Sequence, residues 1–232
     1  MRRLLTALIL ALSLAAPALR AEPGPVVVEL FTSQGCSNCP PADAMLLELA
    51  ERDDVIALAL HVDYWDYIGW KDSFADPAHT RRQKAYAYAA NQAAVYTPQM
   101  VIAGQTHVVG TRAMEVADAI RDHAGVDHGI TLDVQRDGDA LRIALRHDGP
   151  GLKPARIHLV RYTPREVVDI RRGENAGRKL TYGNIVTGWE VLTDWSGQRD
   201  LDLNAQVPGE DRAVVLVQRV GPGPILAAGE AR

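Results

Sequence analysis

The stretch VVVELFTSQGCSNCPPADAMLLEL, residues 26–49, decides how this 232-residue chain begins to fold. It opens with a nearly continuous apolar run at 26–31, which is typical of a strand buried on both faces of a parallel or mixed sheet. A short turn follows, and then Cys36 and Cys39 immediately precede Pro40. A proline is tolerated in the first turn of a helix, because the N–H groups there have no partner within the helix. The pattern predicts a strand, a turn with a Cys-x-x-Cys pair, and a helix that begins around the second cysteine.

Strands and helices continue to alternate after this stretch. The hydrophobic pattern predicts a buried strand at 55–62, an irregular aromatic segment at 63–76, a helix at 77–94, a hairpin at 99–103 and 106–109, and a helix at 111–123 with Thr111 as its cap. The order β-α-β-α-β-β-α indicates an α/β domain with a parallel core sheet and an antiparallel edge.

The second half of the chain has a different pattern. Apolar and polar residues alternate at 130–134 and 140–146 around Asp137-Gly138, which predicts a β-hairpin. Further strands are predicted at 156–162, 190–193 and 213–220. We therefore expect one domain over residues 22–125 and a second, β-rich domain over 126–232, arranged as a small sandwich.

Residues 1–21 have the pattern of a secretory signal peptide. Arg2 and Arg3 precede an apolar run at 4–15, and small residues follow it. An uncleaved membrane anchor is the alternative, but this run is shorter than the roughly 20 residues that a spanning helix needs. We expect cleavage, a periplasmic or secreted protein, and no membrane association afterwards.

The composition limits the classes of partner. Hydrophobic residues make up 47% and charged residues 23% of the chain, as in ordinary globular proteins. The net charge of −4 becomes −7 when the three arginines of residues 1–21 are removed. This charge argues against nucleic acid or an anionic membrane as the main partner.

The two cysteines lie only three residues apart. A disulfide that closes so short a loop restricts the unfolded chain little, so the pair is a poor structural crosslink and a good redox pair. A cysteine at a helix N-terminus has a lowered pKa, and the thiolate is the nucleophile of disulfide exchange. We expect Cys36 to be the exposed, attacking sulfur and Cys39 to be the more buried, resolving one.

The succession of strand, Cys-x-x-Cys-Pro, helix, strand, helix and Thr97-Pro98 hairpin resembles the thioredoxin fold. The resemblance covers roughly residues 25–124. It implies that Pro98 follows a cis peptide bond and faces the cysteine pair, and that Thr97 offers backbone hydrogen bonds to a bound substrate.

The sequence departs from thioredoxin in three places. Gly35 stands where thioredoxin has Trp, Ser37-Asn38 replaces Gly-Pro between the cysteines, and Leu30 occupies the position of a buried acid. Glu29 is the nearest acid, and it is either a hydrogen-bonded strand-end carboxylate or a proton acceptor for Cys39. The direction of the redox reaction stays open.

More narrowly, the mature chain resembles a family of secreted bacterial thioredoxin-like proteins of unassigned function. The resemblance lies in residues 29–43, 61–66, 96–99 and 172–177. It implies a fold and no particular substrate.

Two further segments have a structural and a functional interpretation. The aromatic residues of 63–76, with Trp65 among them, either pack as a lid over the sheet end or contact substrate beside Cys36. The loop at 171–178 is either a solvated turn or a cationic arm whose Arg172 reaches the cysteines and stabilises a thiolate.

These features favour an exported thiol–disulfide oxidoreductase that acts on protein or small-molecule disulfides, with an unnamed redox partner and no cofactor. The alternative is a binding or metal-handling module with little turnover. In that alternative, His61, His107 and Met100 join the cysteines around Cu(I). We expect no metal, because a closed zinc site needs four ligands and the cysteines supply two.

Overall fold

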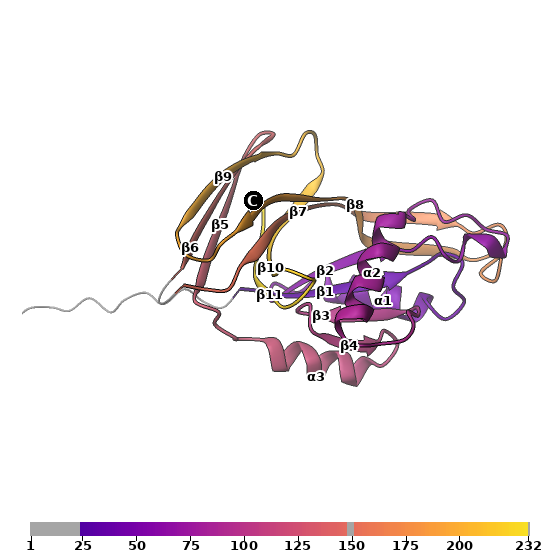
Figure 1. Cartoon of the computed structure of the whole chain (residues 1–232). Coiled ribbons are helices and arrows are strands. Elements are labelled where there is room, and N and C mark those ends of the chain that lie inside the picture. Colours follow the sequence, from indigo (N-terminus) through magenta and orange to yellow (C-terminus); the bar gives the residue numbers. More distant parts are fainter. Residues whose placement is uncertain (1–23, 148–150, 232) are drawn as a thin grey trace, which may run out of the picture.

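The computed structural model describes residues 24–147 and 151–231 (Figure 1). The predicted signal peptide, residues 1–21, lies outside this range. Within it, no helix combines the length and the apolar character needed to cross a membrane.

The first half forms the predicted order of strands and helices. Its elements are β1 (Val26–Thr32), α1 (Pro40–Leu49), β2 (Val55–His61), the 3₁₀ helix η1 (Asp66–Ile68), α2 (Pro77–Ala89), β3 (Gln99–Ile102), β4 (Thr106–Val109) and α3 (Ala113–His123). Two details of the prediction are wrong. The helix expected to reach residue 94 ends at Ala89, and Arg112 rather than Thr111 occupies the N-cap of α3, with no side-chain capping bond.

The second half is β-rich, as expected. Its strands are β5 (Ile130–Asp137), β6 (Ala140–His147), β7 (Ala155–Asp169), β8 (Lys179–Trp195), β9 (Leu201–Gln206), β10 (Arg212–Arg219) and β11 (Ile225–Glu230). The sequence did not predict β9 or β11, and it underestimated β7 and β8. Register shifts in the β7–β8 pairing interrupt the alternation of apolar and polar residues, which hides the full length of both strands.

The separate sandwich is a wrong prediction. Strands from both halves build one eight-stranded sheet, in the order β11-β10-β7-β8-β2-β1-β3-β4. Within it, β1 and β2 are parallel, and β8 joins β2 through the single registered pair Ala59 and Ile185. A three-stranded sheet, β5-β6-β9, packs against the far end of the large sheet, away from α1 and α2 (Figure 1). Two β-layers do face each other there, but one of them continues into the α/β half.

Alternation along β1 sorts its side chains between two cores. Val28 and Leu30 pack with α1 and α3, whereas Val27 and Phe31 pack on the opposite face, beside Tyr86 of α2. Because successive side chains of a strand point to opposite faces, this alternation also fixes which polar residues of β1 reach the cysteine loop.

Candidate functional site

The cysteine pair lies in the connection between β1 and α1. The loop after Thr32 carries Cys36, and Cys39 occupies the N-cap of α1. The two cysteines form a disulfide with Cα atoms 5.4 Å apart. Pro40 and Pro41 open the helix, where their missing N–H groups leave no intrahelical bond unmade.

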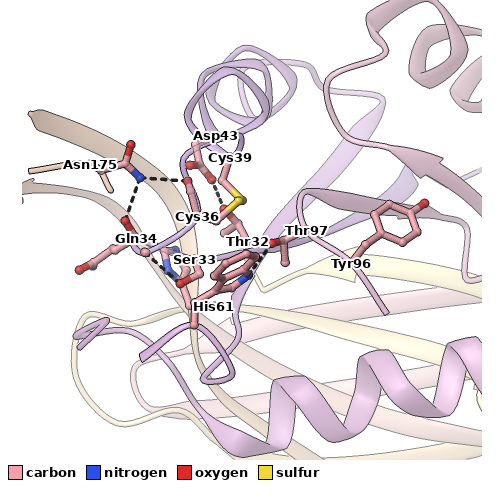
Figure 2. Close-up of a disulfide and its surroundings, with 12 residues drawn as sticks. Thr32, Ser33, Gln34, Cys36, Cys39, Asp43, His61, Tyr96, Thr97 and Asn175 are labelled. Carbon is pink, nitrogen blue, oxygen red and sulfur yellow. Dashed lines mark hydrogen bonds between the residues drawn. A yellow bond between two sulfur atoms is a disulfide. The ribbon is translucent and has the colours of Figure 1, made fainter. Parts of the chain in front are cut away.

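Cys36 is more buried than the sequence led us to expect. Its exposed fraction is 2% and that of Cys39 is 0%, so the prediction of an exposed Cys36 is wrong in this disulfide form. The surroundings are nevertheless polar (Figure 2), with Thr32, Asp43 and Asn175 drawn around the sulfur atoms. The cover comes from two segments far away in the sequence, the β7–β8 connection and the aromatic segment.

The connection between β7 and β8 supplies an asparagine rather than an arginine. The amide of Asn175 donates hydrogen bonds to the carbonyl oxygens of Gln34 (3.0 Å) and Cys36 (2.9 Å). Arg178 in turn donates to the Asn175 side-chain oxygen. The arm therefore reaches the site as predicted, but Arg172 is exposed and makes no hydrogen bond or ion pair among the described residues. The interpretation of Arg172 as the contacting cation is wrong, because the turn directs Asn175 inward instead.

The aromatic segment contacts both sides of the site through two indoles. Trp65 donates to the Thr97 hydroxyl at 2.8 Å, and Trp70 donates to the Gln34 side chain at 2.8 Å. The segment comes so close that a side chain on Gly35 would lie 3.2 Å from the Trp65 Cβ. A tryptophan at position 35 has no room here, which explains one departure from thioredoxin.

The segment before β3 forms the other side of the site (Figure 2). The Thr97–Pro98 peptide bond is cis, as the resemblance implied. Pro98 is buried and Thr97 is partly exposed, with its hydroxyl held by Trp65. Among the described residues, the backbone N–H and C=O groups of Thr97 have no hydrogen-bond partner. These groups are free to pair with an extended segment that lies across the cysteines.

Glu29 does not serve the cysteines. It shares the α2 face of β1 with Val27 and Phe31, and Arg82 of α2 binds its Oε1 atom through two nitrogens. Cys39 lies at the start of α1, on the opposite face. The interpretation of Glu29 as a proton acceptor for Cys39 is therefore wrong, and the hydrogen-bonded carboxylate is the correct interpretation.

Asp43 is the acid that the fold does place beside Cys39. It lies one helical turn after that cysteine on α1, is 4% exposed, and accepts a 2.7 Å hydrogen bond from the Thr32 hydroxyl. Burial raises the pKa of Asp43 from 3.8 to about 7, against the opposing effects of His61 and the Thr32 hydroxyl. A carboxyl group with such a pKa exchanges protons near neutral pH. The sequence carried a signal for this residue, since Asp43 interrupts the buried face of α1 between Ala42 and Leu46.

His61 is a buried, hydrogen-bonded core residue. Its Nδ1 atom lies 2.7 Å from Asp72 Oδ2, and both side chains are fully buried. The sulfur and nitrogen ligands considered for copper do not come together. Met100 packs in the α1 core, while His107 lies against Tyr86 on the opposite face. Among the described residues, no group of three His, Cys, Asp or Glu side chains is placed to hold a metal ion.

The fold and the site define a mixed α/β protein. It has one large eight-stranded β-sheet and a Cys-x-x-Cys disulfide at a strand–helix junction. The model of a family described as protein of unknown function (DUF1223) matches residues 27–218, and the chain belongs to that family.

Two solved structures are similar to this one. Protein AGR_C_4864 from Agrobacterium tumefaciens is 29% identical, with a TM-score of 0.75 over 91% of this chain and 96% of that one. HBP35 of Porphyromonas gingivalis is 14% identical, with a TM-score of 0.58 over 90% of this chain and 75% of that one, so the likeness concerns the fold alone. No curated protein matches the chain.

Proposed function

We propose that this protein is a thioredoxin-like thiol–disulfide oxidoreductase that acts outside the cytoplasm. The observation that carries the proposal is the placement of the Cys36–Cys39 disulfide at the start of α1, between a buried acid and the free backbone of Thr97. The N-terminal pattern of residues 1–21 supports export.

In the reducing direction, the Cys36 thiolate attacks a substrate disulfide. One substrate sulfur bonds to Cys36, and the other leaves as a thiolate with the electron pair of the broken bond. The Cys39 thiolate then attacks the Cys36 sulfur, forms the observed disulfide and releases the second substrate thiolate. The substrate gains two electrons, and a thiol or dithiol partner must return two electrons to the pair. The oxidising direction runs the same steps backwards.

Asp43 handles the proton of the resolving step. Cys39 must lose its proton before it attacks, and the thiolate form is the nucleophile. The Asp43 carboxylate is one turn along the same helix and has a pKa raised by burial to about 7. It therefore accepts the proton when it is ionised and returns it in the reverse reaction.

The substrate binds along the segment before β3. Thr97 pairs with the substrate backbone through its free N–H and C=O groups, Pro98 faces the sulfur atoms, and Trp65 fixes the Thr97 hydroxyl. The same Trp65 contact supports both earlier interpretations of the aromatic segment, as a lid and as a substrate rim.

A dithiol–disulfide exchange assay with insulin tests the proposal. Wild-type protein should accelerate insulin reduction by a dithiol, and Cys36→Ser should remove that acceleration. Equal rates of insulin reduction for the two proteins would contradict the proposal that the protein is an oxidoreductase. The 2% exposure of Cys36 favours a second candidate, a binding module with little turnover, and equal rates would support it.

A further inference from the structure

Three buried polar atoms behind the disulfide lack a partner among the described residues. They are Asp43 Oδ2, His61 Nε2 and Tyr182 Oη, and they come from α1, β2 and β8. An unpaired buried polar group costs about 1–3 kcal/mol. Three such atoms in one place point to a common partner.

The strand register brings these residues to one face of the sheet. Thr32 of β1 pairs with His61 of β2, and the side chains of both point toward α1, where Thr32 binds Asp43. The ring of Tyr182 meets the His61 ring edge to face, with centroids 5.0 Å apart. We call Asp43, His61, Asp72 and Tyr182 the polar cluster.

Asp72 orients the imidazole of His61. Its Oδ2 accepts from the Gln34 N–H, and its Oδ1 accepts from the Phe74 N–H. Burial acts to raise the pKa of Asp72, but His61 and these N–H groups lower it below its ordinary value. The carboxylate therefore accepts a hydrogen bond from the Nδ1–H of His61, and Nε2 is left without a partner among the described residues.

A cavity lies beside the polar cluster, at Asp43. It has a volume of about 350 Å³ between α1 and the start of β8, and Asp43 forms part of its wall. Arg178 and Lys179 are exposed and also line it. A buried water makes about three hydrogen bonds.

We propose that the polar cluster is a proton relay for Cys39, with water joining Asp43 Oδ2, His61 Nε2 and Tyr182 Oη, and that protons leave it through the cavity between α1 and β8. The relay rests on the proposed function. Substrate approaches the sulfurs from the Thr97 side, and protons pass on the side of α1 and β8. His61 and Asp72 are positioning residues here, because they act on Cys39 through Asp43.

Each proton and electron pair of the resolving step is accounted for. Cys39 gives its proton to Asp43, and the proton passes through water to His61 Nε2 or to the cavity. The electron pair of the Cys39 thiolate forms the bond to Cys36, and the substrate thiolate that leaves takes up a proton from solvent.

The groups that face Asp43 come from every element around it. They are the Thr32 hydroxyl on β1, His61 on β2, Asp72 on the aromatic segment, Tyr182 on β8 and Arg178 on the β7–β8 connection. Burial is the largest influence and raises the pKa of Asp43; His61, the Thr32 hydroxyl and Arg178 favour its ionised form, whereas Asp72 opposes it.

An NMR titration of the full-length protein tests the relay without requiring turnover. The His61 ring nitrogens and the Asp43 carboxyl carbon are followed against pH, once with the disulfide intact and once after reduction by a phosphine. We expect the two groups to show the same two-step curve, since interacting sites titrate as a pair. We also expect the midpoints to move on reduction, because Cys39 then joins the relay.

Two variants complete the test. His61→Asn keeps a donor for Asp72 but cannot titrate, and it should turn the Asp43 curve into a single step and slow Cys39 resolution at neutral pH about tenfold. Tyr182→Phe removes only the unpaired hydroxyl, so it should fold and weaken the coupling. Independent single-step curves for His61 and Asp43 in wild type, or unchanged Asp43 curves in both variants, would overturn the relay. The insulin assay with Cys36→Ser judges the oxidoreductase separately.

Discussion

At the scale of single residues, the site differs most from the sequence-based expectation in the acid beside Cys39, which is Asp43. Its carboxyl is buried between α1 and the sheet, held by Thr32 and close to Cys39. The sequence pattern pointed to Glu29, the acid nearest to the position where thioredoxin has its buried acid. The pleat of β1 directs Glu29 to the other face, so proximity along the chain was a poor guide.

The first prediction concerns the pH dependence of Asp43. Its pKa is raised from 3.8 in the unfolded chain to about 7, so the folded state binds the proton more tightly. The contribution of Asp43 to stability is therefore fully present below about pH 4 and is lost as the pH rises through about 7, by an amount on the order of 4 kcal/mol. Asp43→Asn, whose side-chain oxygen still accepts from Thr32, should remove this fall. Urea unfolding of both oxidised proteins across that pH range measures the difference, and parallel stability curves would contradict it.

The second prediction concerns the clamp on the Cys36 loop. Asn175→Ala leaves the carbonyl oxygen of Gln34 unpaired and leaves that of Cys36 with the Cys39 N–H as its one remaining donor, which should reduce stability by about 1–3 kcal/mol and speed reduction of the disulfide by a dithiol. Arg172→Ala is the matched control in the same turn. This exposed residue should change stability by less than about 0.5 kcal/mol. A larger loss of stability in Arg172→Ala than in Asn175→Ala would contradict this account and favour the interpretation of Arg172 as a cation that contacts the site.

At the scale of elements, the contact between the start of α1 and the β3–β4 hairpin sets the position of the cysteines. Gly110 follows β4 and donates its N–H to the Pro98 carbonyl. A Cβ at this position would lie 3.1 Å from the Ala42 Cβ and 3.2 Å from the Pro98 Cβ. Only a glycine lets helix and hairpin approach so closely.

The third prediction follows from that approach. Gly110→Ala forces α1 away from Pro98, so we expect a loss of stability of about 1–3 kcal/mol and a slower exchange reaction. Gly24→Ala serves as the control, since a Cβ there meets only the Ala228 carbonyl oxygen at an ordinary 3.4 Å. Denaturant unfolding and the insulin assay report the two effects. Wild-type behaviour of Gly110→Ala would show that this contact does not position the cysteines.

The elements of the first half were predictable because each has a strong local signal. Continuous apolar runs gave β1 and β2, and prolines marked the starts of α1 and α2. The polar cluster was not predictable, because it joins residues that only the strand register and the β7–β8 hairpin bring together. Asn175 also lacked a signal as a contact, since nothing local distinguishes an inward-pointing asparagine from a solvated one.

At the scale of the whole molecule, the two halves share one sheet and a buried polar network. Arg82 binds Glu29 of β1 and Gln218 of β10, and its guanidinium lies 3.8 Å from the ring centre of Trp189. The sequence predicted two domains because the pattern changes near residue 126, but pattern alone does not show which strands pair across such a change. The edge of β2 pairs with β8, which makes the second half part of the sheet that carries the cysteines.

The fourth prediction tests this network. Arg82→Met leaves the Glu29 carboxylate buried without a counter-charge, which should cost about 3–5 kcal/mol. The double variant Glu29→Leu with Arg82→Met should recover part of that loss, because neither charge then remains buried alone. Chemical unfolding of the single and double variants gives the coupling energy as a double-mutant cycle. Purely additive effects would show that Glu29 and Arg82 do not stabilise each other in the folded protein.

The most direct measurement of the redox claim is the equilibrium of the folded protein with a series of dithiol–disulfide buffers, read out by alkylation and mass spectrometry. We predict that Cys36 and Cys39 are reduced and reoxidised together while the fold persists. Their potential should lie above about −300 mV, the limit below which structural disulfides typically fall. A pair that resists reduction until the chain unfolds, or a potential well below that limit, would contradict the assignment and leave the disulfide as a crosslink.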